Sequence, residues 1–417
     1  MRSVRLTVWF GKAIARLTRL AGGHASALPG LAAERLDPDF LPKIMRQLPL
    51  GVAVVSGTNG KTTTTKIVVE LLRAAGLKVF TNPSGSNFTR GVISAAIEQM
   101  KKGRLDCDIA VLELDEAHAV RFVDKVAPTA ALLLNVLRDQ LDRFGEIDTT
   151  ARYLGAIAAR TVGPVVLNRE DPLVASLPTR QPVYFGYSDK VAALFPSDAE
   201  LYGRPALAAA AVPTDRPVAA VVLEDLGPGW AAFNLGTARL SLPGAHNAFN
   251  AAAALALAGQ LLPGRFEADQ ALRALAAVEP AFGRGELFTV DGALTELLLV
   301  KNPSGFRVVL GSQASREAAV MIAVNDAYAD GRDMSWLWDV DFSVLPAVAQ
   351  VSGVRAYDMA LRLDCQQIPV EAVEPDLGAA LRDFLAKTPG QPKQIYASYT
   401  AMLAIRRLLK QAAEGTP

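Results

Sequence analysis

The chain contains a glycine-rich run, Ser56 to Thr63, that reads S-G-T-N-G-K-T-T. The apolar residues 52–55 precede it as a buried strand would, and apolar residues at helical spacing follow it through Leu72. A strand that turns tightly into a helix surrounds an anion with backbone N–H groups and with the positive end of the helix. We therefore predict an α/β fold with a phosphate-binding loop, in preference to a glycine-rich turn without chemistry.

The side chains of this loop suit a nucleotide triphosphate. Gly57 and Gly60 allow the tight turn, Lys61 supplies a positive charge, and the hydroxyl of Thr62 is suited to a magnesium ion. The general motif G-x-x-x-x-G-K-[ST] has glycine where this chain has Val55, so the loop is the shorter G-T-N-G-K-T form. Three further residues complete the expected nucleotide-binding set: Thr58, Asn59 and Thr63.

Composition places the chain among folded proteins of more than one domain. Its 417 residues are 51% hydrophobic and 20% charged, which suits a large core and argues against disorder. The net charge of +1 gives no electrostatic reason to bind nucleic acid, and no apolar run is long enough to span a membrane. The two cysteines, Cys107 and Cys365, suit a reducing compartment and cannot form a four-cysteine zinc site. We expect a cytoplasmic protein without zinc.

The first 21 residues are basic and apolar. Basic residues are scattered among the apolar ones, so a cleaved secretory leader is not expected. We predict that residues 1–45 are a basic helical segment packed on the nucleotide-binding domain, with its arginines in solvent. The alternative is contact of residues 1–21 with the inner face of an anionic membrane. The basic residues are Arg2, Arg5, Lys12, Arg16 and Arg19.

Strand-like segments recur along the chain with helical segments between them. Ala130–Leu134 and Val165–Leu167 are continuously apolar, and Ile109–Leu114 is apolar except at Glu113. Polar residues follow all three segments, as they follow strands of a parallel sheet buried on both faces. Residues 183–242 have a shorter pattern rich in proline, which predicts a β-rich insertion. We therefore predict a mostly parallel α/β domain of the phosphate-loop ATPase type at residues 46–284.

A second, smaller α/β domain is predicted at residues 285–417. Helical patterns separate its strand-like segments, which again favours a mostly parallel sheet. The expected strands are Leu294–Val300, Val320–Val324, Val348–Val351 and Ile395–Ala397.

Polar groups gather after the predicted strands. Glu113 ends one strand and is the expected magnesium ligand together with Thr62, because Mg²⁺ prefers oxygen ligands and keeps several waters. The neighbouring Asp115 and Glu116 either position a substrate or cap the next helix. Residues 135–145 form a second polar loop, for which a solvated charged loop is the alternative.

The start of a later helix carries two amides. His246 and Asn247, with Asn250 one turn further on, would place both amides on one face, where they suit the edge of an adenine ring. A helix N-cap is the alternative role of Asn247.

In their order along the chain, these motifs resemble the Mur ligase family. The resemblance covers residues 50–290 and depends on G-T-N-G-K-T-T, the strand-end Glu113, N-x-x-x-D-Q-L-D-R-F, G-A-H-N-x-x-N and F-G-R. It implies that ATP phosphorylates a carboxylate and that an amine attacks the resulting acyl phosphate. Lys61 and Glu113 are then the expected catalytic residues of this domain, and Arg284 of the F-G-R segment is expected to bind the nucleotide.

The C-terminal part resembles one branch of that family. Residues 300–305 read V-K-N-P-S-G, and residues 325–342 read N-D-A-Y-A-D-G-R-D-M-S-W-L-W-D-V-D-F. The resemblance implies amidation of the D-glutamate α-carboxylate in the peptidoglycan stem of lipid II or a related precursor. The ammonia would come from a GatD-like class I glutaminase bound as a heterodimer. Members of this branch often carry a four-cysteine zinc ribbon, but residues 183–242 contain no cysteine.

A glutaminase centre of the chain's own is not expected. Neither cysteine lies in a glycine-flanked nucleophile turn, and none of the three histidines is near either cysteine in sequence. The resemblance implies that the partner supplies cysteine and histidine, and that Asp333 of this chain orients the partner's histidine. The alternative is that Asp333 only caps a helix that begins at Met334.

Two other functions remain as alternatives. The first is a stand-alone Mur-type ligase that joins an amino acid to a precursor, which would need an amino-acid pocket in the C-terminal domain. The second is a non-catalytic nucleotide-binding scaffold, which the intact set of Lys61, Thr62 and Glu113 disfavours.

Overall fold

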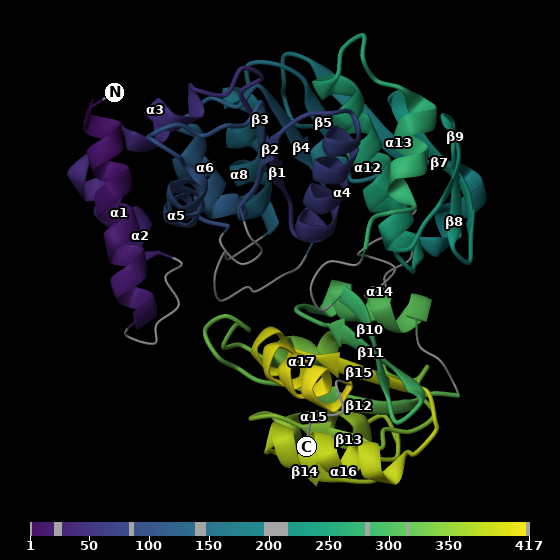
Figure 1. Cartoon of the computed structure of the whole chain (residues 1–417). Coiled ribbons are helices and arrows are strands. Elements are labelled where there is room, and N and C mark those ends of the chain that lie inside the picture. Colours follow the sequence, from purple (N-terminus) through teal and green to yellow (C-terminus); the bar gives the residue numbers. More distant parts are fainter. Residues whose placement is uncertain are drawn as a thin grey trace.

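The phosphate-loop strand β1 lies inside a nine-stranded sheet of order β2-β3-β1-β4-β5-β6-β7-β8-β9. The structure is a computed structural model that describes residues 2–20, 27–82, 87–137, 147–195, 216–279, 284–313 and 317–413. The strands from β2 to β7 pair in parallel, and β7, β8 and β9 pair antiparallel (Figure 1). The strands are β1 (Val52–Ser56), β2 (Val79–Phe80), β3 (Ile109–Glu113), β4 (Ala130–Leu133), β5 (Val165–Asn168), β6 (Pro182–Tyr187), β7 (Ala219–Gly227), β8 (Trp230–Phe233) and β9 (Gly236–Arg239).

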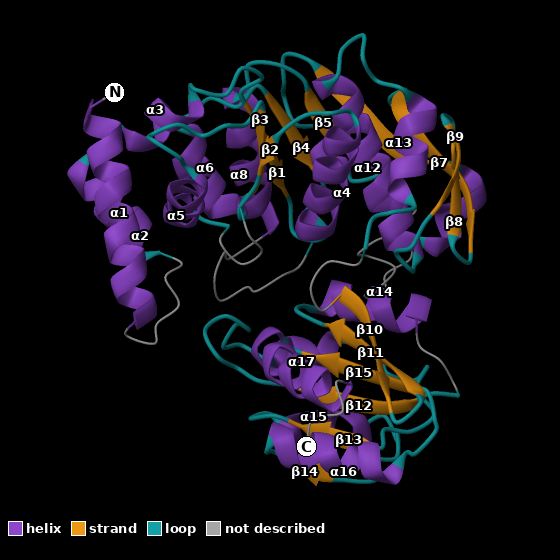
Figure 2. Ribbon diagram, in the orientation of Figure 1, coloured by secondary structure: helices purple, strands orange, loops and turns teal. Residues whose placement is uncertain are grey.

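Helices cover both faces of this sheet (Figure 2). Alternate residues of β1 belong to different cores: Ala53 and Val55 pack with α4, α12 and α13, and Val52 and Val54 pack with α5, α6 and α8. Because both faces are buried, β1 and β3 are apolar at every position before their last, polar residue, rather than at every second position. The helices are α4 (Lys61–Ala74), α5 (Thr89–Gln99), α6 (Glu116–Val123), α8 (Ile147–Arg160), α9 (Pro172–Ala175), α12 (Ala245–Leu261) and α13 (Ala268–Leu275), with the 3₁₀-helix η1 at Asp189–Leu194.

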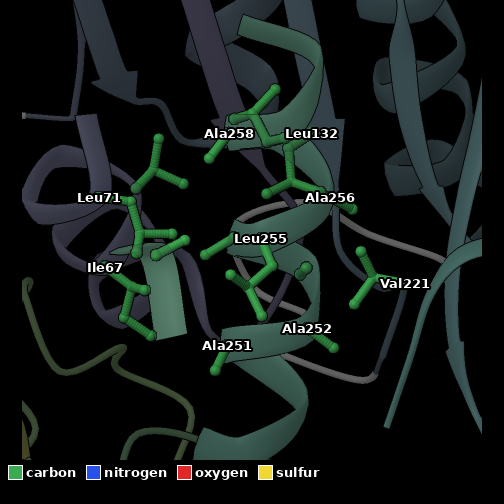
Figure 3. Packing of buried hydrophobic residues seen from close by; sticks show 14 of the residues in the cluster. Ile67, Leu71, Leu132, Val221, Ala251, Ala252, Leu255, Ala256 and Ala258 are labelled. Atoms are coloured by element: carbon green, nitrogen blue, oxygen red, sulfur yellow. The ribbon is translucent and has the colours of Figure 1, made fainter. Parts of the chain in front are cut away.

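The alanine-rich helix α12 packs between α4 and the sheet. Its alanines between positions 251 and 258 are buried, and Leu255 lies among them close to Ile67 and Leu71 of α4 (Figure 3). Small side chains let two helices approach closely, since no methylene groups separate their backbones. This packing fixes the first turn of α12 beside the phosphate loop, where a Cβ on Gly60 would lie 2.5 Å from Asn250 Oδ1.

The β-rich stretch at residues 183–242 continues the main sheet. The sequence predicted an insertion, but β6 pairs in parallel with β5, β7 pairs in parallel with β6, and β8 and β9 complete the edge. The physical reason is that Phe185, Val221 and Leu223 belong to the same hydrophobic core as α12. These strands therefore help to hold α12 in place. Residues 196–215 lie outside the described part of the chain.

A second sheet has the order β10-β11-β15-β12-β13-β14. Strands β11 to β14 run parallel, and they include all four strands expected from the sequence; β10 pairs antiparallel with β11. The elements are β10 (Arg284–Val290), β11 (Ala293–Leu299), α14 (Pro303–Gln313), β12 (Ala319–Ala323), η2 (Ser335–Asp339), β13 (Gln350–Ser352), α15 (Ala356–Asp364), β14 (Val373–Glu374), α16 (Leu377–Lys387), β15 (Lys393–Ala397) and α17 (Tyr399–Ala413).

Three helices, α1 (Arg2–Leu20), α2 (Leu28–Leu36) and α3 (Phe40–Met45), lie at one edge of the first domain (Figure 1). Helix α1 packs on α2 and α5. Its Val4 and Val8 belong to the core that contains α5 and α6, and its Ala15 is buried as well. Among the described residues, no helix is both long enough and apolar enough to cross a bilayer.

Candidate active site

The loop between β1 and α4 has the turn that its glycines predict. Gly57 has a φ of +133° and Gly60 a φ of +87°, and α4 begins directly afterwards at Lys61. A Cβ at Gly57 would come within 2.9 Å of the backbone N of Asn135, so glycine is required by conformation and by space. The loop and the first turn of α4 together present backbone N–H groups in the manner of an anion site.

Asn135, which lies two residues after the end of strand β4, holds the loop in place. Its side chain accepts a hydrogen bond from the Asn59 N–H (2.8 Å) and donates one to the Asn59 carbonyl (3.1 Å). Its backbone carbonyl accepts from the Thr58 N–H at 2.9 Å. The sequence placed Asn135 in a polar loop but did not assign it to the nucleotide site. Its position after a predicted strand places it at the ligand-binding edge of the sheet, but its contact with the loop depends on β4 lying next to β1, which only the fold shows.

We expect Asn135→Ala to weaken nucleotide binding by about tenfold, because it removes two contacts that hold Asn59, each worth about 1 kcal/mol. Isothermal titration with ATP and Mg²⁺ measures this. The matched control is Asn234→Ala, because Asn234 also accepts from one backbone N–H, that of Val222, and donates to one carbonyl, that of Ala220, far away on β7. Equal affinities of the two variants would contradict the clamp role.

Lys61 is held at the loop by buried polar groups. Its ammonium donates to the carbonyls of Gly57 and Thr58 and pairs with Glu116 at 3.3 Å. Lys61 and Glu116 are only 6% and 3% exposed, so each buried charge depends on the other. Glu116 therefore contacts the phosphate-loop lysine directly. The sequence had suggested two other roles for Glu116, substrate positioning and helix capping.

Thr62 and Glu113 form an oxygen pair at the same end of the sheet. The Thr62 hydroxyl donates to Glu113 Oε1 at 2.8 Å. Asn82, on the loop after β2, fixes the Glu113 backbone by donating to its carbonyl (2.9 Å) and accepting from its N–H (3.0 Å). Close by in sequence, Asp115 is buried, its side chain makes no capping hydrogen bond, and its Oδ1 has no partner among the described atoms.

These oxygens fit a magnesium ion held by few protein ligands. The Thr62 hydroxyl and the Glu113 carboxylate are hard ligands in contact, and Mg²⁺ takes its other ligands from phosphate and water. Within the described ranges, no three His, Cys, Asp or Glu side chains gather as a closed metal cage. The structure brings Thr62 and Glu113 into contact, and their role as magnesium ligands stays a prediction. Asp115 occupies the N-cap position of α6, but its side chain makes no capping hydrogen bond.

A cavity of about 200 Å³ lies beside the loop, between the two domains. The buried Asn302, which directly precedes α14, donates from Nδ2 to Asn59 Oδ1 at 3.0 Å and so joins the second domain to the phosphate loop. Figure 1 shows α14 on the side of the second domain that faces the first. Residues lining the cavity include Asn59, Gly60, Thr63, Asn135, Phe195, His246, Asn247, Phe249, Asn250, Leu298, Lys301 and Asn302.

The amides of α12 line this cavity. Asn247 lies inside the helix, since the N-cap is Gly244, and its Nδ2 donates to the Pro243 carbonyl at 2.6 Å. The N-cap alternative for Asn247 is therefore wrong. Apolar and aromatic groups beside paired amides suit a planar, polar-edged ring. Arg284 begins β10, but its side chain lies outside what the structure describes, as do residues 138–145 of the predicted polar loop.

Asp333 lies in the second domain, between β12 and η2. It is exposed, and its Oδ1 accepts from the Ser335 N–H at 2.9 Å. A hydrogen bond from the Ser335 side chain, with that from its backbone, lowers the pKa of Asp333. The helix-cap alternative is wrong, because η2 begins at Ser335 and its N-cap is Met334. Asp333 makes only a turn contact to the Ser335 N–H, and it presents a carboxylate at the surface.

Two families match the sequence. The Mur ligase middle domain matches residues 55–258, and the MurT ligase C-terminal domain matches residues 299–402. The subunit MurT of lipid II isoglutaminyl synthase (glutamine-hydrolyzing) from Streptococcus pneumoniae is 30% identical, with 94% of each chain covered. The same subunit from Staphylococcus aureus is 28% identical, with 98% of each chain covered.

Solved structures show the same fold. MurF ligase from Thermotoga maritima, solved with ADP, has a TM-score of 0.69 at 18% identity, covering 92% of this chain and 84% of that one. A pseudomurein peptide ligase type C from Methanothermus fervidus has a TM-score of 0.68 at 16% identity, covering 90% and 80%.

Proposed function

We propose, from the premise that this chain belongs to the MurT family of Mur ligases, that it is the ATP-dependent synthetase subunit of an amidating complex. Its substrate is the α-carboxylate of D-glutamate in the peptidoglycan stem, carried on lipid II or a related precursor, and its product is D-isoglutamine. The observation that carries the proposal is that Lys61 and Thr62, with Glu113 in contact with Thr62, belong to the same phosphate loop whose Asn59 lines the cavity and bonds Asn302 of the second domain.

The residues at the loop suit the first chemical step, which makes a carboxylate reactive. A carboxylate is a poor electrophile, so its oxygen first takes the γ-phosphoryl group of ATP, which gives an acyl phosphate and ADP. The loop N–H groups and Lys61 oppose the negative charge of the group in transfer. Thr62 and Glu113 would hold Mg²⁺, which when bound neutralises phosphate charge. Asn135 and Asn302 keep Asn59 of the loop in position.

The second step needs ammonia in its unprotonated form. The ammonia nitrogen attacks the acyl carbon, and the carbon–oxygen bond to phosphate breaks. Phosphate leaves with the electron pair of that bond and takes up the proton that the nitrogen loses, so the products are the amide and hydrogen phosphate. Glutamine hydrolysis next to the site supplies ammonia without exposure to bulk water. The chain's own cysteines are unsuited to that hydrolysis: burial raises the pKa of Cys107, which disfavours its thiolate, and Cys365 is exposed at the end of α15.

A partner glutaminase would dock on the surface that carries Asp333. Helix α15 packs on η2, where Arg362 donates to the Leu337 carbonyl at 3.2 Å and the Val340 carbonyl at 2.7 Å. Around these two elements, large apolar side chains are exposed, as at the centre of a protein interface. They are Tyr328, Trp338, Val354, Tyr357 and Leu361.

Sheet topology supports a short route for ammonia. The carboxyl ends of parallel strands lie at one edge of a sheet, and β11 and β12 both run parallel to β15. The Asn302 contact to the phosphate loop follows β11, and the segment with Asp333 follows β12. A glutaminase on that segment would therefore lie at the sheet edge that also contacts the ATP site.

Co-purification with a class I glutaminase, followed by mass analysis of the precursor, tests this function. With ATP, Mg²⁺ and glutamine, we expect the precursor to change from acid to amide, and we expect no product when ATP is omitted. Free ammonia should replace glutamine and partner together. Addition of an amino acid to the precursor instead would identify a stand-alone ligase and contradict the proposal.

A further inference from the structure

Helix α1 presents an apolar stripe to solvent. Leu6, Trp9 and Leu17 are 65%, 71% and 65% exposed, and Phe10 is exposed beside them. These positions are spaced i, i+3, i+4 and i+11, so they lie along one face of the helix. A single exposed leucine is ordinary, but a continuous face of large apolar side chains that includes tryptophan marks an interaction surface.

The opposite face of α1 is fixed against the domain. Val4, Val8 and Ala15 are buried, and the helix comes so close to α5 that a Cβ on Gly11 would lie 2.8 Å from Ile97 Cδ1. Rotation of the helix to hide the stripe would expose these residues instead. The helix therefore has two apolar faces: one is buried against the domain, and the other, the stripe, is exposed to solvent.

Positive charge borders the stripe. The helix contains five basic and no acidic residues. Arg5 and Arg16 are exposed on the flank between the stripe and the buried face. Arg5 Nε donates to the Lys102 carbonyl at 3.1 Å, which brings the exposed Lys101 and Arg104 of that loop near the same end of the helix.

We propose that α1 is an interfacial helix that docks the protein on an anionic lipid surface. Trp9 and Leu17 would insert at headgroup depth, while the arginines contact lipid phosphates. A protein occupant would need an acidic surface to match the basic border, whereas an anionic bilayer supplies negative charge and apolar depth together. The inference goes beyond the proposed function. It rests on that function in one respect only: a lipid-linked precursor is the reason why the protein would dock on a membrane.

Sedimentation of the full-length protein with lipid vesicles tests this docking. We expect binding to vesicles of phosphatidylcholine mixed with phosphatidylglycerol and much weaker binding to phosphatidylcholine alone. Trp9→Ser combined with Leu17→Ser should lower binding by about tenfold or more, since each loses an inserted apolar group. Val162→Ser combined with Leu194→Ser is the matched control, because these residues are similarly exposed, at 56% and 53%, on other elements.

A local readout connects the binding to α1. Trp9→Phe should keep vesicle binding but lose most of the blue shift of tryptophan fluorescence that lipid induces. Arg16→Gln should weaken binding only to the anionic vesicles. Failure of the protein to sediment with anionic vesicles overturns the inference, as does equal binding by the Trp9/Leu17 variant. A stripe variant that converts a dimer into a monomer would identify a contact between two copies and overturn it as well.

The two proposals fail separately. Amidation of a water-soluble precursor fragment with ammonia uses the nucleotide site and needs no membrane, so the Trp9/Leu17 variant should retain it. Loss of vesicle binding with intact amidation is the result expected of the variant. A wild-type protein that binds vesicles but never amidates would overturn the proposed function and leave the docking role of α1 standing.

Discussion

Lys61→Met is expected to lower ATP-dependent amidation by about 100-fold or more, with ammonia as the nitrogen source so that the glutaminase plays no part. The lysine opposes charge on the group in transfer, and methionine matches its length without its charge. A coupled assay for ADP release gives the rate. An effect limited to the KM for ATP would show that Lys61 only binds the ground state and would contradict its catalytic role.

Stability must be separated from chemistry in this experiment. Removal of Lys61 leaves Glu116 buried without its partner, which costs about 3–5 kcal/mol. The double variant Lys61→Met with Glu116→Gln removes both charges, so it should regain stability and stay inactive. Lys393→Met is the matched control, because Lys393 is also a buried lysine but lies on β15, outside the loop. The folded fraction of the Lys393→Met protein should have the same amidation rate per molecule as the wild type.

The main sheet was predictable where each strand is buried on both faces. The segments at β1, β3, β4 and β5 are continuously apolar apart from the polar residue that ends β1, β3 and β5, and helical patterns separate them. Periodicity failed at residues 183–242, because an extension of a sheet and a separate insertion have the same short apolar pattern. Only the packing of Phe185 and Val221 on α12 distinguishes them.

The edge strand β10 was missed although it has a sequence signal. Asp291 and Gly292 form a two-residue turn between β10 and β11, with φ values of +48° and +76°. An Asp-Gly pair between two strand-like segments is a typical hairpin signal. The prediction began its strands only after this turn, and so it omitted the first half of the hairpin.

The part of the candidate site that forms one continuous segment was predictable from the sequence. The residues that the fold brings to it from distant segments were less predictable. The loop residues from Gly57 to Thr63 form one local motif. Asn135 and Asn302 reach Asn59 from other strands, and this depends on which strand lies next to β1 and on how the second domain docks. Neither is encoded in local spacing, so their roles emerge only in the folded chain.

Asp333→Asn should abolish glutamine-dependent amidation and leave ammonia-dependent amidation unchanged. A carboxylate that accepts the second ring N–H of a partner histidine fixes its tautomer, and loss of such a group lowers turnover on the order of 10³-fold or more. The exposed position of Asp333 suits this role, because a partner can reach it. Parallel assays of the complex with glutamine and with ammonium salt measure the two activities.

Asp341→Asn is the matched control for this prediction. Asp341 accepts from the Ser343 N–H at 2.9 Å just as Asp333 accepts from the Ser335 N–H, and this type of contact lowers the pKa of both. If loss of this turn contact has no effect of its own on activity, Asp341→Asn should keep both the glutamine-dependent and the ammonia-dependent activity.

The lowered pKa of Asp333 fixes the pH dependence of this effect. The hydrogen bonds from Ser335 hold the pKa of Asp333 below the usual range of an aspartate, so its carboxylate stays charged at the pH where a histidine titrates, near about 6.5. Any acid limb of glutamine-dependent activity near neutral pH should then belong to the partner's histidine or cysteine. Equal loss of glutamine- and ammonia-dependent activity in Asp333→Asn would show that Asp333 supports the fold and would exclude it from the glutaminase centre.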